Sequence, residues 1–124
     1  MRLYLDIDGV LLTKRGDLAN GAEAFLRWAI ANHEPVWLST RTRDGTHRGA
    51  LRAFHGLLDP ALIEAVAPAR WDTLKVEALK GDWRWLDDEL LYTERNWLAR
   101  NDALHRFVRI NLKLAPDVLL SLRW

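Results

Sequence analysis

Short apolar runs alternate along this chain with stretches whose apolar residues recur at helical spacing. A short run bounded by polar residues is typical of a buried strand, whereas helical recurrence is typical of an amphipathic helix. Strands are expected at 3–5, 36–38, 83–86 and 107–110, and segment 63–66 fits either a short strand or a helical turn. Helices are expected at 22–30, 50–58, 72–79, 93–100 and 116–124. Asn20 is the expected N-cap of the first helix, and Asp72 or Thr73 that of the third.

This alternation predicts an α/β fold in which a mostly parallel, five-stranded sheet carries helices on both faces, giving an α/β/α sandwich of three layers. No linker, repeat or low-complexity stretch interrupts the sequence, so residues 1–124 are expected to form a single domain. In such sheets ligands bind beyond the carboxyl ends of the strands. Functional residues are therefore expected there.

Two carboxylates follow the first apolar run, at Asp6 and Asp8. Residues two apart on a strand share a face, so both side chains are expected at one spot, with Gly9 allowing a sharp turn after them. Two adjacent acids repel each other, and a divalent cation such as Mg²⁺ relieves that repulsion. A calcium loop of the EF-hand kind also begins Asp-x-Asp, but Leu11 and Asp17 stand where that loop requires Gly and Glu. The other alternative is a pair of solvated turn aspartates.

Three expected strands end in groups that can carry chemistry. These groups are Asp6 and Asp8, then Ser39-Thr40, then Asp87-Asp88. Because the carboxyl ends of parallel strands meet at one edge of the sheet, we expect these groups to lie together. Paired carboxylates with a cation suit phosphoryl transfer, in which one acid attacks phosphorus and the other moves a proton.

The composition of the chain excludes only a few classes of site and partner. The formal net charge is +1, which favours no particular class of partner. The chain has no cysteine, which excludes thiol nucleophiles, disulfides and thiolate metal sites. No apolar run approaches the length of a membrane span, and Asp6 comes too early for the apolar region of a signal peptide. We therefore expect a cytoplasmic protein without a membrane partner.

The order of these motifs resembles the haloacid dehalogenase-like superfamily. The resemblance rests on Asp6-Ile7-Asp8-Gly9-Val10, a Ser/Thr after the second strand, a lysine on a helix and a later acidic pair, and it spans residues 1–110. It implies a Rossmann-like sheet and a Mg²⁺-dependent phosphatase. It also implies that Asp6 is the nucleophile forming an aspartyl-phosphate. Asp8 would be the general acid/base, with its backbone carbonyl on the metal.

The same resemblance assigns the remaining pocket. Ser39 would bind the phosphate, with Thr40 as the second choice and a turn that closes the strand as the structural alternative. Lys75 or Lys80 would supply the positive charge, and Lys75 is preferred because a cation in the first turn of a helix is unfavourable unless an anion lies nearby. The later acidic pair would complete a metal site whose expected ligands are Asp6, Asp8, Asp87 and Asp88. Of that pair, the second acid would reach the metal and the first would orient Lys75 or the loop, although helix capping is an alternative.

The spacing of the motifs leaves no room for a cap domain, since segments 9–38 and 40–74 hold only short elements. An open site suits phosphates on large partners, such as polynucleotide ends. Arg41 and Arg43 are expected on its rim, where guanidinium groups bind phosphate oxygens. The alternative function is a catalytically idle binding or interaction module with the same fold.

Overall fold

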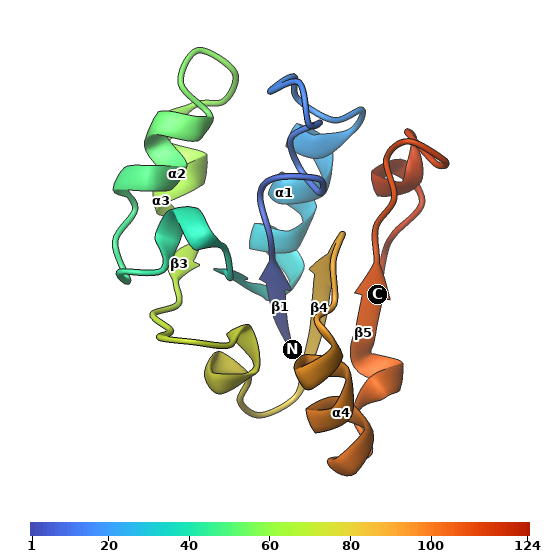
Figure 1. Ribbon diagram of the computed structural model, residues 1–124. Coiled ribbons are helices and arrows are strands. Elements are labelled where there is room, and N and C mark those ends of the chain that lie inside the picture. Colours follow the sequence, from blue (N-terminus) through green and yellow to red (C-terminus); the bar gives the residue numbers. More distant parts are fainter.

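The computed structural model describes residues 1–124. Five parallel strands form one sheet in the order β3-β2-β1-β4-β5 (Figure 1). The strands are β1 (Arg2–Leu5), β2 (Glu34–Trp37), β3 (Ala67–Pro68), β4 (Trp83–Asp87) and β5 (Phe107–Arg109). The expected α/β class and parallel five-stranded sheet are thus confirmed. Because β1 is central, its carboxyl end lies between those of β2 and β4.

Four α-helices and four 3₁₀ turns accompany the strands, and all but the last turn lie between strands. The helices are α1 (Ala22–Asn32), α2 (Arg48–Ala53), α3 (Pro60–Glu64) and α4 (Tyr92–Arg100). The turns are η1 (Thr40–Thr42), η2 (Lys75–Ala78), η3 (Leu104–Arg106) and η4 (Val118–Leu120). No helix combines the length and apolar composition needed to cross a membrane.

Segment 63–66 forms no strand. Ile63 lies in α3, and the third strand comes after it, at Ala67–Pro68. Asp59 caps this helix by accepting a hydrogen bond from the Ala61 N–H at 2.9 Å, and Pro60 occupies the first helical position. A capping aspartate followed by proline favours a helix start, which explains why the helical alternative holds here.

Two expected helices are much shorter than the sequence pattern indicates. Only η2 forms within 72–79, and it begins after Leu74, because the backbone N–H groups of residues 72, 73 and 74 all donate to the Glu77 carboxylate. Only η4 forms within 116–124, where Leu119 is the one fully buried residue. An isolated helix this short is marginal without a buried face. At α1 the N-cap position belongs to Gly21, and Asn20 instead donates to Asp117 at 2.8 Å.

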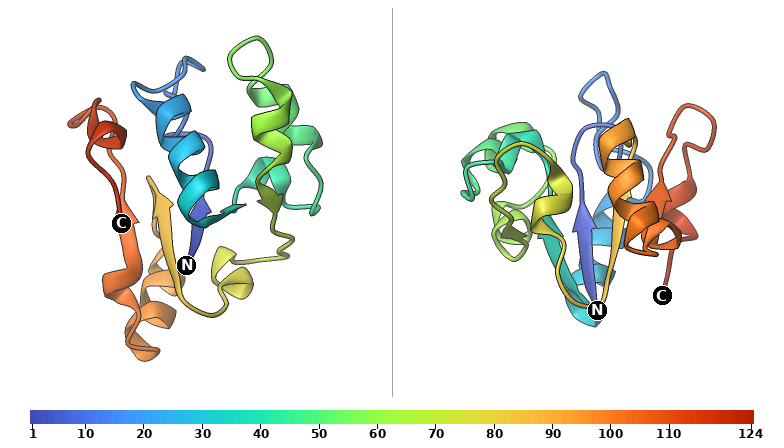
Figure 2. Two further views of the ribbon diagram at one scale, coloured as in Figure 1. Left: turned by 180° about the vertical axis from the view of Figure 1, so that it is seen from behind. Right: turned by 60° about the horizontal axis from the view of Figure 1, so that its bottom comes forward.

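Apolar side chains form a separate cluster on each face of the sheet. Leu3 and Leu5 of β1 pack in one cluster with Phe25 of α1, and seen from behind α1 lies over the sheet (Figure 2). Tyr4 points the other way and packs in the second cluster with Leu98 of α4. This alternation is what a strand buried on both faces requires. It fixes the register of β1 and therefore the position of the residues that follow it.

Candidate active site

The backbone brings three strand ends together. Leu5 pairs with Trp37 on one side and with Leu86 on the other. The Asp6 N–H donates to the Leu86 carbonyl at 3.0 Å, which fixes Asp6 beside the end of β4. The expected meeting of the strand ends is therefore present.

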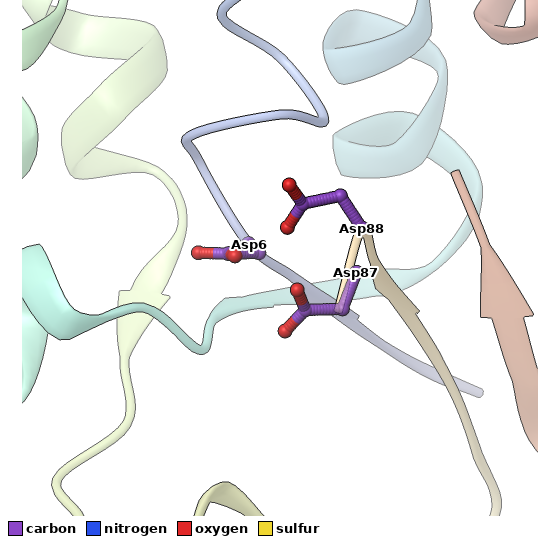
Figure 3. Close-up of side chains that lie close together, drawn as sticks. All are labelled: Asp6, Asp87 and Asp88. Carbon is purple, nitrogen blue, oxygen red and sulfur yellow. The ribbon is translucent and has the colours of Figure 1, made fainter. Parts of the chain in front are cut away.

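Three carboxylates gather at this edge, from Asp6, Asp87 and Asp88 (Figure 3). One oxygen from each lies within 4.8 Å of the others. Gly9 permits this arrangement, since a Cβ at that position would collide with the Asp88 carboxylate. We call these three residues the carboxylate cluster. Its oxygen-rich donor set is the kind that Mg²⁺ prefers.

Lys75 reaches into the carboxylate cluster from η2. Its Nζ lies 3.2 Å from Asp6 Oδ2 and 2.7 Å from Asp87 Oδ2. Burial lowers the pKa of Lys75, but the charges of the two aspartates outweigh it and the pKa is raised overall. Lys80 is exposed and forms no ion pair. The geometry therefore places the expected lysine, Lys75, at the site.

Asp87 is the most deeply buried acid of the carboxylate cluster. Besides Lys75, its carboxylate accepts hydrogen bonds from the Trp85 indole N–H and the Glu89 backbone N–H, both at 3.2 Å. Burial, reinforced by the charge of Asp6, raises the pKa of Asp87 to about 6 despite Lys75. Burial also raises the pKa of Asp88, and Asp87 adds to that effect. Such a cluster gains from a cation, because like charges in a desolvated site repel strongly.

The Asp8 carboxylate lies outside the carboxylate cluster. Arg41 binds it with two hydrogen bonds, Nε to Oδ2 at 2.7 Å and Nη2 to Oδ1 at 3.0 Å. The expectation that Asp6 and Asp8 share one spot assumed that β1 continues, but β1 ends at Leu5. The chain then turns around Ile7, whose carbonyl accepts three backbone N–H groups from residues 10–12. Both acids still line the same cavity.

The two hydroxyl candidates differ in position. Ser39 is fully buried, and its Oγ accepts the Arg41 backbone N–H at 3.1 Å, the turn-closing arrangement. Thr40 is exposed and lines the cavity. Of the two, Thr40 is thus the hydroxyl residue placed at the cavity wall.

Glu94 is a site residue that the sequence reasoning missed. It lies buried in the first turn of α4 and lines the cavity. Its Oε2 accepts the Lys75 backbone N–H at 3.0 Å, and its Oε1 accepts the Leu91 N–H at 3.3 Å. Burial raises its pKa. Only the Glu94 half of a capping box is present, because Leu91 at the N-cap has no side-chain acceptor, so the sequence carries no clear signal for this role.

Two hollows adjoin at this edge of the sheet. The first is the cavity just described, of about 300 Å³, which contains the carboxylate cluster, Lys75 and Glu94. The second, of about 410 Å³, is lined by residues 40, 41, 43, 44 and 70–72. We call it the arginine hollow, because Arg41, Arg43 and Arg70 line it.

Comparisons with protein-family models, with curated proteins and with solved structures yield no match. Any assignment of function therefore depends on the geometry of the site itself.

Proposed function

We propose that this protein is a Mg²⁺-dependent phosphomonoester hydrolase of the haloacid dehalogenase-like kind, acting through an aspartyl-phosphate on Asp6. The observation that carries the proposal is the carboxylate cluster with Lys75 at its edge, located where β1 and β4 end. A nucleophilic carboxylate needs an adjacent positive charge to approach an anionic phosphate. Lys75 supplies that charge.

The chemistry divides between two aspartates. An Asp6 oxygen attacks phosphorus and forms a P–O bond while the ester P–O bond breaks. Asp8 donates a proton to the departing oxygen, and then accepts one from the water that hydrolyses the aspartyl-phosphate. Phosphate leaves and Asp6 is regenerated. Asp8 must first part from Arg41, which occupies both of its oxygens, and take up a proton from solvent.

The carboxylate cluster fits Mg²⁺, since its oxygen atoms are close together and carry more negative charge than Lys75 neutralises. Asp6, Asp88 and the backbone carbonyl of Asp8 would hold the ion, while Asp87 orients Lys75. When bound, Mg²⁺ neutralises charge on the phosphate oxygens. The Asp8 side chain remains outside this set.

The architecture supports an open site. An apolar cluster on each face of the sheet supports the three-layer reading. The segments between β1, β2 and β4 are occupied by short helices and turns, which supports the absence of a cap. An uncapped site admits phosphates on large substrates, including polynucleotide ends. Thr40, Arg41 and Arg43 are the proposed contacts for such substrates.

A catalytically idle binding module is the second candidate. The bidentate Arg41–Asp8 pair favours it, because a carboxylate held at 2.7 and 3.0 Å is not free to move protons. In this alternative the carboxylate cluster still binds a cation, but no phosphoester is hydrolysed.

Hydrolysis of p-nitrophenyl phosphate separates the two candidates. We expect Mg²⁺-dependent turnover that EDTA removes and that Asp6→Asn abolishes, while Asp82→Asn, at an exposed turn before β4, retains it. Near-normal turnover in Asp6→Asn would show that the covalent mechanism is wrong. Mg²⁺ binding by calorimetry without any turnover of phosphoesters would favour the binding module.

A further inference from the structure

We propose that the arginine hollow binds a second phosphate group, carried by the leaving group of the phosphomonoester whose first phosphate lies at Asp6. This inference rests on the proposed function and narrows its substrates to compounds with two phosphates. It assigns roles to Arg70 and Trp71, which no sequence motif indicated.

The two hollows are contiguous. Thr40 and Trp71 line both the cavity with the carboxylate cluster and the arginine hollow. A ligand with one phosphate beside Asp6 can therefore extend past these two residues without leaving the protein surface. The volume of about 410 Å³ is ample for a phosphate and part of the group that carries it.

Backbone contacts hold the walls of the arginine hollow in place. Asp44 and Arg70 form an antiparallel bridge, and the Trp71 N–H donates to the Arg43 carbonyl at 3.3 Å. The Trp71 indole N–H donates to the Ser39 carbonyl at 3.2 Å, which ties the hollow to the end of β2. The Arg43 guanidinium lies over the Trp71 ring, 5.0 Å from its centroid. The hollow is therefore built on paired chain segments, and stacking restrains one of its cations.

Two of the three guanidinium groups of the arginine hollow are available to a ligand, whereas that of Arg41 is bound to Asp8, and Asp72 adds an acid to the lining. Neither Arg43 nor Arg70 forms an ion pair. Asp44 is occupied elsewhere: its carboxylate accepts the backbone N–H and the hydroxyl of Thr46, both at 3.0 Å, and these bonds lower its pKa. Guanidinium groups bind phosphate oxygens through two parallel hydrogen bonds. A phosphate is the ligand that matches several such groups.

Arg41 links the two hollows, because it lines the arginine hollow while its guanidinium binds Asp8. A second phosphate would compete with Asp8 for this arginine. Filling the hollow would then free the Asp8 carboxylate for proton transfer. The Arg41–Asp8 pair, which favours the idle binding module, would thus make proton transfer depend on a substrate that carries a second phosphate.

Equilibrium binding tests the proposal without turnover. Asp6→Asn protein with Mg²⁺ is titrated by calorimetry with thymidine 3′-phosphate and thymidine 3′,5′-bisphosphate, and with glucose 6-phosphate and glucose 1,6-bisphosphate. The bisphosphates should bind about tenfold more tightly, as expected for charge-assisted hydrogen bonds. A preference in both pairs supports recognition of the phosphate alone, and a preference confined to thymidine supports a nucleotide substrate.

Two arginine variants and a matched control complete the test. Arg43→Gln and Arg70→Gln should each reduce the preference for bisphosphates by about three- to tenfold. Arg100→Gln, an equal charge change at an exposed position that ends α4, should leave it unchanged. No preference in either pair, or a preference that survives both changes, overturns the proposal. Failure of the wild type to hydrolyse aryl phosphates overturns the proposed function instead, since the binding preference is measured independently.

Discussion

Lys75→Met should destabilise the metal-free protein severely. Methionine keeps the apolar stem of the side chain and removes its charge, leaving Asp6 and Asp87 in a desolvated site without the ion pairs at 3.2 and 2.7 Å. Removing one partner of a buried pair costs about 3–5 kcal/mol, because the other partner remains as an uncompensated charge. That is a large share of the stability of about 5–15 kcal/mol typical of a domain.

The size of this effect should depend on pH. The raised pKa of Lys75 means that its contribution is complete at neutral pH and is lost only as the pH rises through its folded-state pKa. Asp87, with a pKa of about 6, takes up a proton near pH 5, and its neutral carboxyl group then no longer needs the positive charge of Lys75. The cost of Lys75→Met should therefore be smaller at pH 5 than at pH 7.5.

Urea unfolding in EDTA, followed by tryptophan fluorescence, measures the effect. With a dependence of the free energy of unfolding on urea of about 1–3 kcal/mol per molar, a loss of about 3–5 kcal/mol should lower the midpoint at pH 7.5 by about 1–5 M. Lys80→Met is the matched control, at an exposed lysine without an ion pair, and should cost less than about 0.5 kcal/mol. Adding Mg²⁺ should restore part of the stability that the Lys75 variant loses in EDTA. Equal midpoints for the two variants in EDTA would refute the reasoning.

Three further predictions concern the same site. The pKa of Asp87 is raised to about 6 from its usual value near 4. The free energy of unfolding of the metal-free protein should therefore fall by about 3 kcal/mol as the pH rises from about 4 to about 6. Asp87→Asn should remove that decline in urea unfolding, and an unchanged pH profile would contradict the pKa. Glu94→Ala should cost about 1–3 kcal/mol of stability and lower kcat, because two backbone N–H groups lose their acceptor. Glu94→Gln should restore only part of both, because its amide has one acceptor oxygen for the two N–H groups. Equal loss in the two Glu94 variants would show that the acceptor is unimportant. Gly9→Ala should weaken Mg²⁺ binding in calorimetry at least about tenfold by displacing Asp88, whereas Gly16→Ala, with a similar φ but open space, should not.

The sequence indicates the central sheet well, because its strands are encoded locally. The runs Leu3–Leu5 and Trp83–Leu86 are bounded by polar residues, are apolar except for Arg84, and lie in β1 and β4. The expected helix at 72–79 fails because of local side-chain hydrogen bonds rather than because of its pattern of apolar residues. Whether 72–79 extends its helix is decided by the capture of three backbone N–H groups by Glu77, which no periodicity reveals.

Part of the candidate site can likewise be predicted from the sequence, and part depends on the folded chain. The rule that functional residues follow parallel strands brings Asp6, Asp87 and Asp88 together. The preference for Lys75 over Lys80 assumes a helix over 72–79; only η2 forms there, yet Lys75 does lie at the carboxylate cluster. The Asp8–Arg41 pair could not be foreseen, since it depends on the turn after β1. The catalytic roles of these residues stay predictions.

The central place of β1 has a consequence for how the site comes into being during folding. Asp6, Asp8 and Arg41 precede the exposed turn at Gly56, and Lys75, Asp87, Asp88 and Glu94 follow it. The amino-terminal half of the chain thus carries the proposed nucleophile, and the other half carries its counter-charge and two acids of the carboxylate cluster. The pairing of β1 with β4 joins them, a contact between residues far apart in sequence and therefore slow to form. Cation binding should thus report on the docking of two halves of a chain, and a nascent polypeptide should acquire it only after β4 has emerged.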